Sequence, residues 1–210
     1  MIKKIIIFFK NKKFYLKVSL IFSTLLTSCA KDYYSSTNIA DYQSYIAKVS
    51  LANYWMPKLE EVGEFEEFLV TLRLSNDIFE DMTDSIGLFL KYDETNYKKE
   101  KAEIESAYHL LNNESQLPDN YNIPESDMTL YDYLETIKDF DAEINGYYIQ
   151  VVYRDLTEVK YYEYWLNLEL IGFNEKEQKI CYLYHYNGGT VKIKNLDEFI
   201  VDRYNFPSWF

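Results

Sequence analysis

Few residues of this 210-residue chain have the types and spacing that could do chemistry. Its two histidines, His109 and His185, stand far apart in the sequence, which argues against a zinc enzyme. One cluster of acids comprises Asp77, Glu80, Asp81 and Asp84. These acids could supply oxygen ligands to calcium, but they lack the alternating spacing and the turn glycine of a calcium loop. We therefore interpret both histidines as structural or surface residues and the four acids as a solvated loop.

The sequence also lacks the local motifs of the common enzyme classes. It has no nucleophile elbow, no phosphate-binding loop, no dinucleotide fingerprint and no zinc-protease helix. The 34 acidic residues ensure that some carboxylates lie close together, so a carboxylate pair alone does not indicate a glycosidase. We predict no catalytic residue, no cofactor, no metal site and no enzymatic activity.

The first 28 residues have the pattern of an export leader. They contain six lysines and no acidic residue, and an apolar run of about nine residues covers Val18–Leu26. A run of this length suits the core of a signal peptide and is too short to span a bilayer as a helix, which needs about 20 residues. Positive charge before the run favours an amino terminus that stays inside while the rest of the chain crosses the membrane.

Leu26-Thr27-Ser28-Cys29 closes this leader. The four residues resemble the recognition box of bacterial lipoproteins. The resemblance implies cleavage between Ser28 and Cys29, a diacylglyceryl thioether on Cys29 Sγ and palmitate-type acyl chains that anchor the protein to the extracytoplasmic face of the cell membrane. The alternatives are an ordinary secreted protein with a chance cysteine and an uncleaved anchor. The stretch from Leu90 to Leu111 also resembles uncharacterised lipoproteins of low-GC bacteria, which implies no catalytic residues.

The mature chain is strongly acidic. The full sequence has 22 basic and 34 acidic residues, and removal of the six leader lysines leaves 16 basic residues and a net charge of −18. This charge argues against a nucleic-acid partner, because phosphate binding needs a basic surface, and it makes a basic protein a candidate partner. If Cys29 carries lipid, Cys181 has no intramolecular partner, so we interpret Cys181 as a small buried hydrophobic residue.

The order of hydrophobic patterns predicts one domain. We expect a lipidated tether over residues 29–38 and a single extracytoplasmic domain over 39–210. The fold class is α+β, with a mostly antiparallel sheet of about five to seven strands and three or so flanking helices. Helices are expected over 39–55, 93–113 and from 195, with an ambiguous short one over 128–141. Strands are expected over 68–74, 85–92, 147–153, 161–173, 178–186 and 191–194.

The helix over 93–113 is the clearest of these elements. Tyr97, Lys101, Ile104, Tyr108 and Leu111 recur at helical spacing and predict one buried stripe, with His109 on the same helix. Either Asp93 or Thr95 could cap its first turn. At the end of the chain, three aromatic residues predict a plug rather than a loose tail: Phe206, Trp209 and Phe210.

Three functions remain open at this stage. The first is a non-enzymatic interaction module that binds a partner through an exposed sheet face, because many of the 22 tyrosines lie on predicted strands. The second is an immunity or inhibitor protein that neutralises a basic toxin or hydrolase. The third is a hydrolase of envelope polymers. The expected partners are the membrane, through the lipid on Cys29, and a basic protein.

Overall fold

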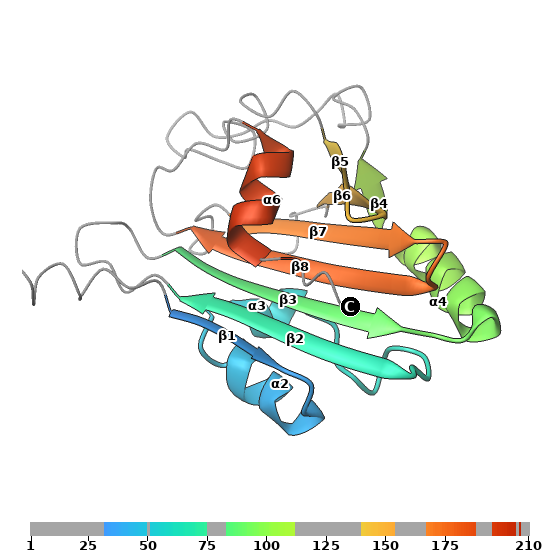
Figure 1. Ribbon diagram of the computed structural model, residues 1–210, viewed down its shortest axis with the longest axis horizontal. Helices are drawn as coiled ribbons and strands as arrows, with labels where there is room; N and C mark the ends of the chain where they lie inside the picture. Colours follow the sequence, from blue (N-terminus) through green and yellow to red (C-terminus); the bar gives the residue numbers. More distant parts are fainter. Residues whose placement is uncertain are drawn as a thin grey trace, which may run out of the picture.

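A single antiparallel sheet organises the protein in a computed structural model (Figure 1). The structure describes residues 32–49, 51–74, 83–111, 140–153, 167–187, 195–204 and 206. The strands are β1 Asp32–Ser36, β2 Glu67–Leu74, β3 Thr83–Lys91, β4 His109–Leu111, β5 Asp141–Ile144, β6 Tyr147–Tyr153, β7 Asn167–Asn174 and β8 Lys179–Asn187. The helices are α2 Ile39–Ile46, α3 Ala52–Trp55, α4 Glu94–Ala107 and α6 Leu196–Tyr204. The predicted α+β class is confirmed.

The strand order brings distant parts of the sequence together. The described strands form an eight-stranded sheet in the order β1-β2-β3-β8-β7-β6-β4, and β5 pairs with β6. Every pairing among them is antiparallel. The strand count exceeds the five to seven that we predicted from the sequence. Two of the additional strands, β1 and β4, lie where we expected a tether and the end of a helix.

The predicted tether is wrong over residues 32–36, because these residues form β1. Asp32 pairs with Leu74 and Ser36 pairs with Val70, so all five residues of β1 pair with the second half of β2. The segment is polar and exposed because it lies at the rim of the sheet, where side chains meet solvent. Among the described residues, regular structure therefore begins at Asp32 rather than at Ile39.

The helix expected over 39–55 is divided into α2 and α3. Asn38 caps α2, since its side chain accepts a hydrogen bond from the Ala40 N–H. Leu51 then takes a left-handed backbone conformation, with φ of 62°, immediately before α3. A non-glycine residue rarely adopts this conformation, and it breaks the helical path. Both short helices still turn residues toward the sheet, Tyr42 and Ile46 from α2 and Ala52 from α3.

Helices cover both faces of the sheet, and the alternation of side chains along the strands assigns each residue to one face. One face packs against α2, α3 and α4, and its buried strand residues include Val70, Leu88 and Tyr182. The other face packs against α6, and its buried residues include Leu69, Phe89 and Leu183. Two separate apolar clusters therefore flank one sheet.

Helix α4 begins as predicted but ends earlier. Asp93 caps it, because the carboxylate accepts hydrogen bonds from the Thr95 and Asn96 N–H groups. Tyr108 is already extended, and the chain continues as β4, in which Leu111 pairs with Val151 of β6. The prediction that His109 and Leu111 belong to the helix is wrong. Leu111 belongs to the apolar cluster that packs against α6, which we call the α6-side cluster. Strand pairing with β6 therefore outweighs the helical spacing.

The buried stripe of α4 provides a stability test. Ile104 is buried against the sheet, so Ile104→Ala should lower the free energy of unfolding by about 2–4 kcal/mol through lost apolar burial and the cavity that remains. Urea denaturation measures this change. The control is Glu103→Ala on the exposed side of the same helix, which should stay within about 0.5 kcal/mol of the parent. An unchanged unfolding midpoint for Ile104→Ala would show that this helix face does not contribute to the core.

The predicted turns and the final helix are confirmed where the structure describes them. Asn145 and Gly146, both with positive φ, join β5 to β6. Asn195 caps α6 by accepting a hydrogen bond from the Glu198 N–H. Phe206 packs edge-on against Phe89 and Tyr147, with ring centroids 5.2 and 5.6 Å away, as expected for an aromatic plug. Trp209, Phe210 and the expected elements over 128–139, 161–166 and 191–194 lie outside the described residues.

Candidate functional site

A buried carboxylate lies between α4 and the sheet. Glu100 projects from the buried side of α4 and is only 5% exposed. Its Oε1 accepts a hydrogen bond of 2.9 Å from the Tyr182 hydroxyl, and its Oε2 accepts one of 2.7 Å from the Gly63 N–H. This group joins three distant segments of the chain: the loop before β2, helix α4 and strand β8. No local motif in the sequence marks Glu100 as a candidate.

Tyrosines surround this carboxylate. Burial, together with the negative charge of Glu100, raises the pKa of both Tyr92 and Tyr182, so both phenols stay protonated. A protonated Tyr182 is the hydrogen-bond donor that Glu100 requires. The arrangement satisfies a buried carboxylate with two internal donors. We therefore interpret it as a structural connection between α4 and the sheet.

A second polar group lies on the opposite face, beneath α6. Ser85 of β3 and His185 of β8 are paired across the sheet, and Ser85 Oγ lies 2.8 Å from His185 Nδ1. Both residues are essentially inaccessible to solvent. Phe199 of α6 meets the imidazole edge-on, with ring centroids 4.8 Å apart. A hydroxyl beside an imidazole could act as a nucleophile with its base, but Phe199 and the sheet separate this pair from any substrate in solution.

Charged residues border the Ser85–His185 pair. Arg73 of β2 is buried and forms an ion pair with Asp202 of α6, with 3.0 Å between Nη1 and Oδ2, and it also donates to the Asp202 carbonyl. Arg203 lies over the Phe199 ring. Burial lowers the pKa of His185 well below its usual value, and the positive charges of Arg203 and Arg73 lower it further. His185 is therefore neutral in the folded protein near pH 7.

The depressed pKa of His185 predicts an acid-sensitive fold. The unfolded chain binds a proton near pH 6.5, whereas the folded chain binds it only at lower pH. Above about pH 6.5, His185 therefore does not lower the free energy of unfolding. Below that value, protonation of the unfolded chain lowers the free energy of unfolding by up to about 1.4 kcal/mol per pH unit. Urea titrations between pH 7.5 and about 5 measure this slope, a range above the ordinary titration of carboxylates.

Two variants identify the group responsible. His185→Asn should remove the slope in this pH range, because asparagine does not titrate. His109→Gln should keep the slope, because His109 is exposed on β4. A slope that survives in His185→Asn would contradict the assignment to the buried histidine.

The structure describes only some of the remaining residues that the sequence made candidates. Cys181 is buried and is a free thiol, and burial raises its pKa, so the interpretation as a small hydrophobic residue is confirmed. Ser28 and Cys29 lie outside the described residues, as do Asp77, Glu80 and Asp81. Asp84, the last of those acids, lies on β3. Within the described part of the chain, no group of three or more His, Cys, Asp or Glu residues is placed to hold a metal ion.

The expectation of an exposed, tyrosine-rich sheet face is wrong for β6, β7 and β8 as far as the structure describes them. Tyr147, Tyr182 and Tyr184 are buried, and helices cover both faces. The number of tyrosines on predicted strands suggested an exposed aromatic face, but a sheet with helices on both faces buries both sets of side chains. Tyr148 is an exception, with 41% of its surface exposed. Any contact with a partner must therefore use another surface.

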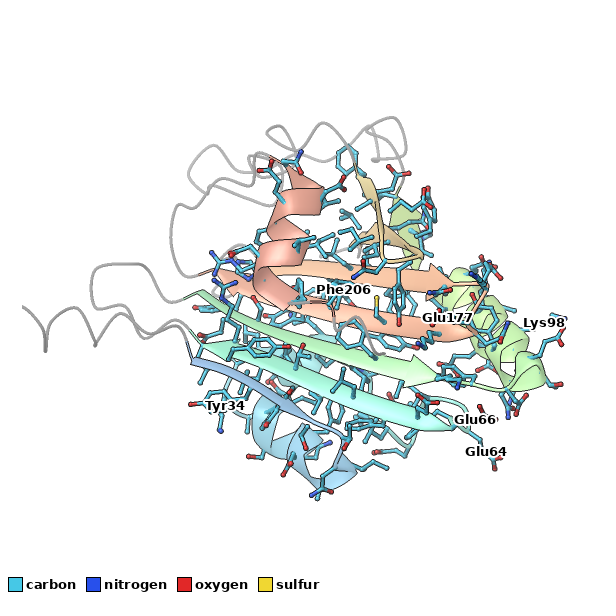
Figure 2. The ribbon with its side chains drawn as sticks, in the orientation of Figure 1. Tyr34, Glu64, Glu66, Lys98, Glu177 and Phe206 are labelled. Atoms are coloured by element: carbon cyan, nitrogen blue, oxygen red, sulfur yellow. The ribbon has the colours of Figure 1, made fainter. Side chains whose placement is uncertain are left out.

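Two surface features remain as candidates, and Figure 2 shows them at opposite ends of the sheet. The first, which we call the proximal aromatic surface, lies where β1 begins and comprises Tyr33, Tyr34, Tyr45 and Lys48. The second, which we call the distal carboxylates, precedes β2 and comprises Glu60, Glu64 and Glu66. Figure 2 labels Tyr34 at one end and Glu64, Glu66 and Glu177 toward the other.

The lysines near the distal carboxylates already have partners. Lys91 pairs with Glu67 at 2.5 Å and Lys179 pairs with Glu177 at 2.6 Å. Lys58 likewise pairs with Glu61 at 2.7 Å. None of the distal carboxylates is in an ion pair with the residues that the structure describes. Glu60 and Glu66 act on Lys58 and Lys91 only from a distance, after the pairs with Glu61 and Glu67, so local lysines neutralise this end of the sheet only in part.

Comparison with known proteins adds no assignment. No protein-family model, curated protein or solved structure matches this chain. Among the described helices, none has both the length and the apolar character needed to cross a membrane.

Proposed function

We propose that this protein is a lipid-anchored extracytoplasmic interaction module that acts by binding a partner rather than by catalysis. The observation that supports this best is the burial of the described side-chain groups that could cooperate in chemistry. Ser85, His185 and Cys181 are at most 1% exposed, and Glu100 is satisfied by two internal donors. The surface, in contrast, offers exposed aromatic rings at one end of the sheet and carboxylates without ion-pair partners at the other.

The membrane anchor is tested at Cys29. Cys29→Ser should abolish metabolic labelling with fatty acid and should leave an unprocessed precursor or a soluble form. Cys181→Ala is the matched control, because it removes the only other cysteine and should leave labelling intact. Labelling that survives Cys29→Ser would contradict the lipoprotein assignment.

A second candidate function, an immunity or inhibitor protein for a basic toxin or hydrolase, is favoured by the distal carboxylates. Opposite charge speeds the encounter of two proteins, and this effect weakens as salt screens the charges. Exposed carboxylates that local lysines do not pair are available for such an encounter. The net charge of −18 expected for the mature chain acts in the same direction.

Capture from an envelope extract distinguishes the two functions. If the protein is an inhibitor, the lipidated chain should capture one basic enzyme and reduce its activity, and Glu64→Gln/Glu66→Gln should slow association several-fold at low salt. The control is Glu103→Gln/Glu105→Gln, which changes the net charge equally on exposed residues of α4. A captured partner that keeps full activity would favour the general interaction module. Equal slowing by both variants would show that the distal carboxylates have no specific role.

A further inference from the structure

We infer that the domain rests on the lipid headgroups through the proximal aromatic surface, in a fixed orientation with the distal carboxylates facing outward. The inference builds on the lipid proposed for Cys29. Only Ala30 and Lys31 separate that cysteine from the first residue of β1. Three residue steps span at most about 11 Å, so the Cys29 and Asp32 Cα atoms cannot lie farther apart than this.

The sheet restrains the other end of this short connection. Asp32 pairs with Leu74, Tyr33 with Arg73 and Tyr34 with Leu72, so β1 is a paired strand from its first residue. A long flexible tether would let the domain turn freely above the membrane. A connection of two residues joined directly to a paired strand instead holds this end of the sheet beside the lipid.

The side chains at this end suit a lipid–water interface. Tyr33 and Tyr34 point to opposite faces of β1, but β1 is an edge strand among those described, so both rings border the same rim of the sheet, with 36% and 39% of their surfaces exposed. The Tyr34 and Tyr45 ring centroids are 6.5 Å apart, and Lys48 Nζ lies 5.4 Å from each. Tyrosine concentrates at membrane interfaces because its ring is apolar and its hydroxyl is polar, and lysine can place its stem in the interface and its charge in water.

The distribution of exposed apolar side chains agrees with this placement. Of the six large exposed hydrophobic residues among those described, four lie on β1, α2 and α3, the elements that follow the proposed anchor. They are Tyr33, Tyr34, Ile39 and Tyr54. Because the mature chain is acidic, anionic headgroups would not attract it. The contact should therefore form on zwitterionic lipid and depend little on salt.

Fluorescence quenching from the headgroup layer tests the orientation. The lipidated full chain is placed in phosphatidylcholine vesicles that contain a small fraction of lipid with a nitroxide on its headgroup. A fluorophore is attached either through Ala47→Cys, beside Lys48, or through Glu64→Cys, at the distal end. Both labels are specific, because lipid would block Cys29 and Cys181 is buried. The label at position 47 should be quenched several-fold more than the label at position 64.

Two further variants separate the anchor from the aromatic surface. A long Gly/Ser spacer between Ala30 and Lys31 should reduce the difference in quenching, because it releases the domain from the anchor. Tyr33→Ser/Tyr34→Ser should also reduce the difference, and unchanged quenching in this variant would overturn the role of the aromatic surface. Circular dichroism of each variant confirms that the sheet remains folded.

The readouts distinguish failure of this inference from failure of the proposed function. If mass spectrometry finds no lipid on Cys29, the proposed anchor and this inference both fail. If Cys29 is lipidated and both labels are quenched equally, the anchor stands and the fixed orientation is overturned. Shielding of position 47 from aqueous quenchers without quenching from the headgroups would assign the surface to another protein or a second copy, which also overturns the inference.

Discussion

The Gly172→Val substitution is expected to lower the free energy of unfolding by about 3 kcal/mol, because it overpacks the α6-side cluster. A Cβ atom at position 172 would lie 2.7 Å from Ile149 Cγ1 and 2.8 Å from Cys181 Sγ. These neighbours belong to β6 and β8, the strands on either side of β7. Relief of the contact on one side would increase it on the other, so the sheet has little room to adjust.

A graded series tests this explanation. Gly172→Ala should cost less than Gly172→Val, because it adds only the Cβ atom. Cys181→Ala should recover part of the loss in the Gly172→Ala background, since it removes the sulfur that the new Cβ atom meets. Urea denaturation of Gly172→Ala, Cys181→Ala and the variant with both substitutions measures the coupling. A Gly172→Val protein within about 0.5 kcal/mol of the parent would show that the strands can separate at this point without cost.

The Glu100→Ala substitution should cost about 2–4 kcal/mol, because it leaves the buried Tyr182 hydroxyl without an acceptor, at about 1–3 kcal/mol, and the half-buried Gly63 N–H adds a smaller loss. The donors are the Gly63 N–H and the Tyr182 hydroxyl. Thermal or urea unfolding measures the loss, and hydrogen exchange at the Gly63 amide should become faster. Glu100→Gln is the closest control, because its amide oxygen can still accept one of the two bonds.

A double-mutant cycle identifies the cause of that loss. In the Tyr182→Phe background one of the donors is already absent, so Glu100→Ala should cost less than it does in the parent. Full additivity of the two substitutions would contradict the hydrogen bond between them. It would mean that the cost of Glu100→Ala arises from lost side-chain packing rather than from the unsatisfied hydroxyl.

Local sequence signals predicted the elements that depend on neighbouring residues. Asp93 and Asn195 cap their helices, and Asn145-Gly146 forms a hairpin turn, because each of these features involves residues only a few positions apart. The errors concern strand pairing between distant segments. The local sequence of β1 is typical of a polar linker, and that of β4 continues the spacing of a helix. Both segments are strands because they pair with β2 and β6, which are distant in the sequence.

The buried polar groups were missed for a related reason. Ser85 and His185 are 100 positions apart, and Glu100 and Tyr182 are 82 apart, so no local motif records either pair. A weaker signal was present in the periodicity. His185 follows Cys181 and Leu183 at every second position of β8, and that spacing assigns it to the same buried face.

Glu100 carried a similar signal. It lies three positions after Tyr97 and four before Ile104, a spacing that places it on the buried side of α4. Periodicity could therefore have predicted that both Glu100 and His185 are buried. It could not have identified their hydrogen-bond partners, since these depend on the strand order.

The position of β8 next to β3 has a consequence for how the chain is made. Phe89 pairs with Cys181, so the centre of the sheet joins residues that leave the ribosome far apart in time. Topologies with such distant contacts fold slowly, because the intervening loop must close before the contacts can form. The edge of β3 stays uncovered until β8 has been synthesised, and an uncovered edge invites pairing with other chains. If the chain is exported, as we propose, the same delay would keep a newly made chain unfolded during its passage through the membrane.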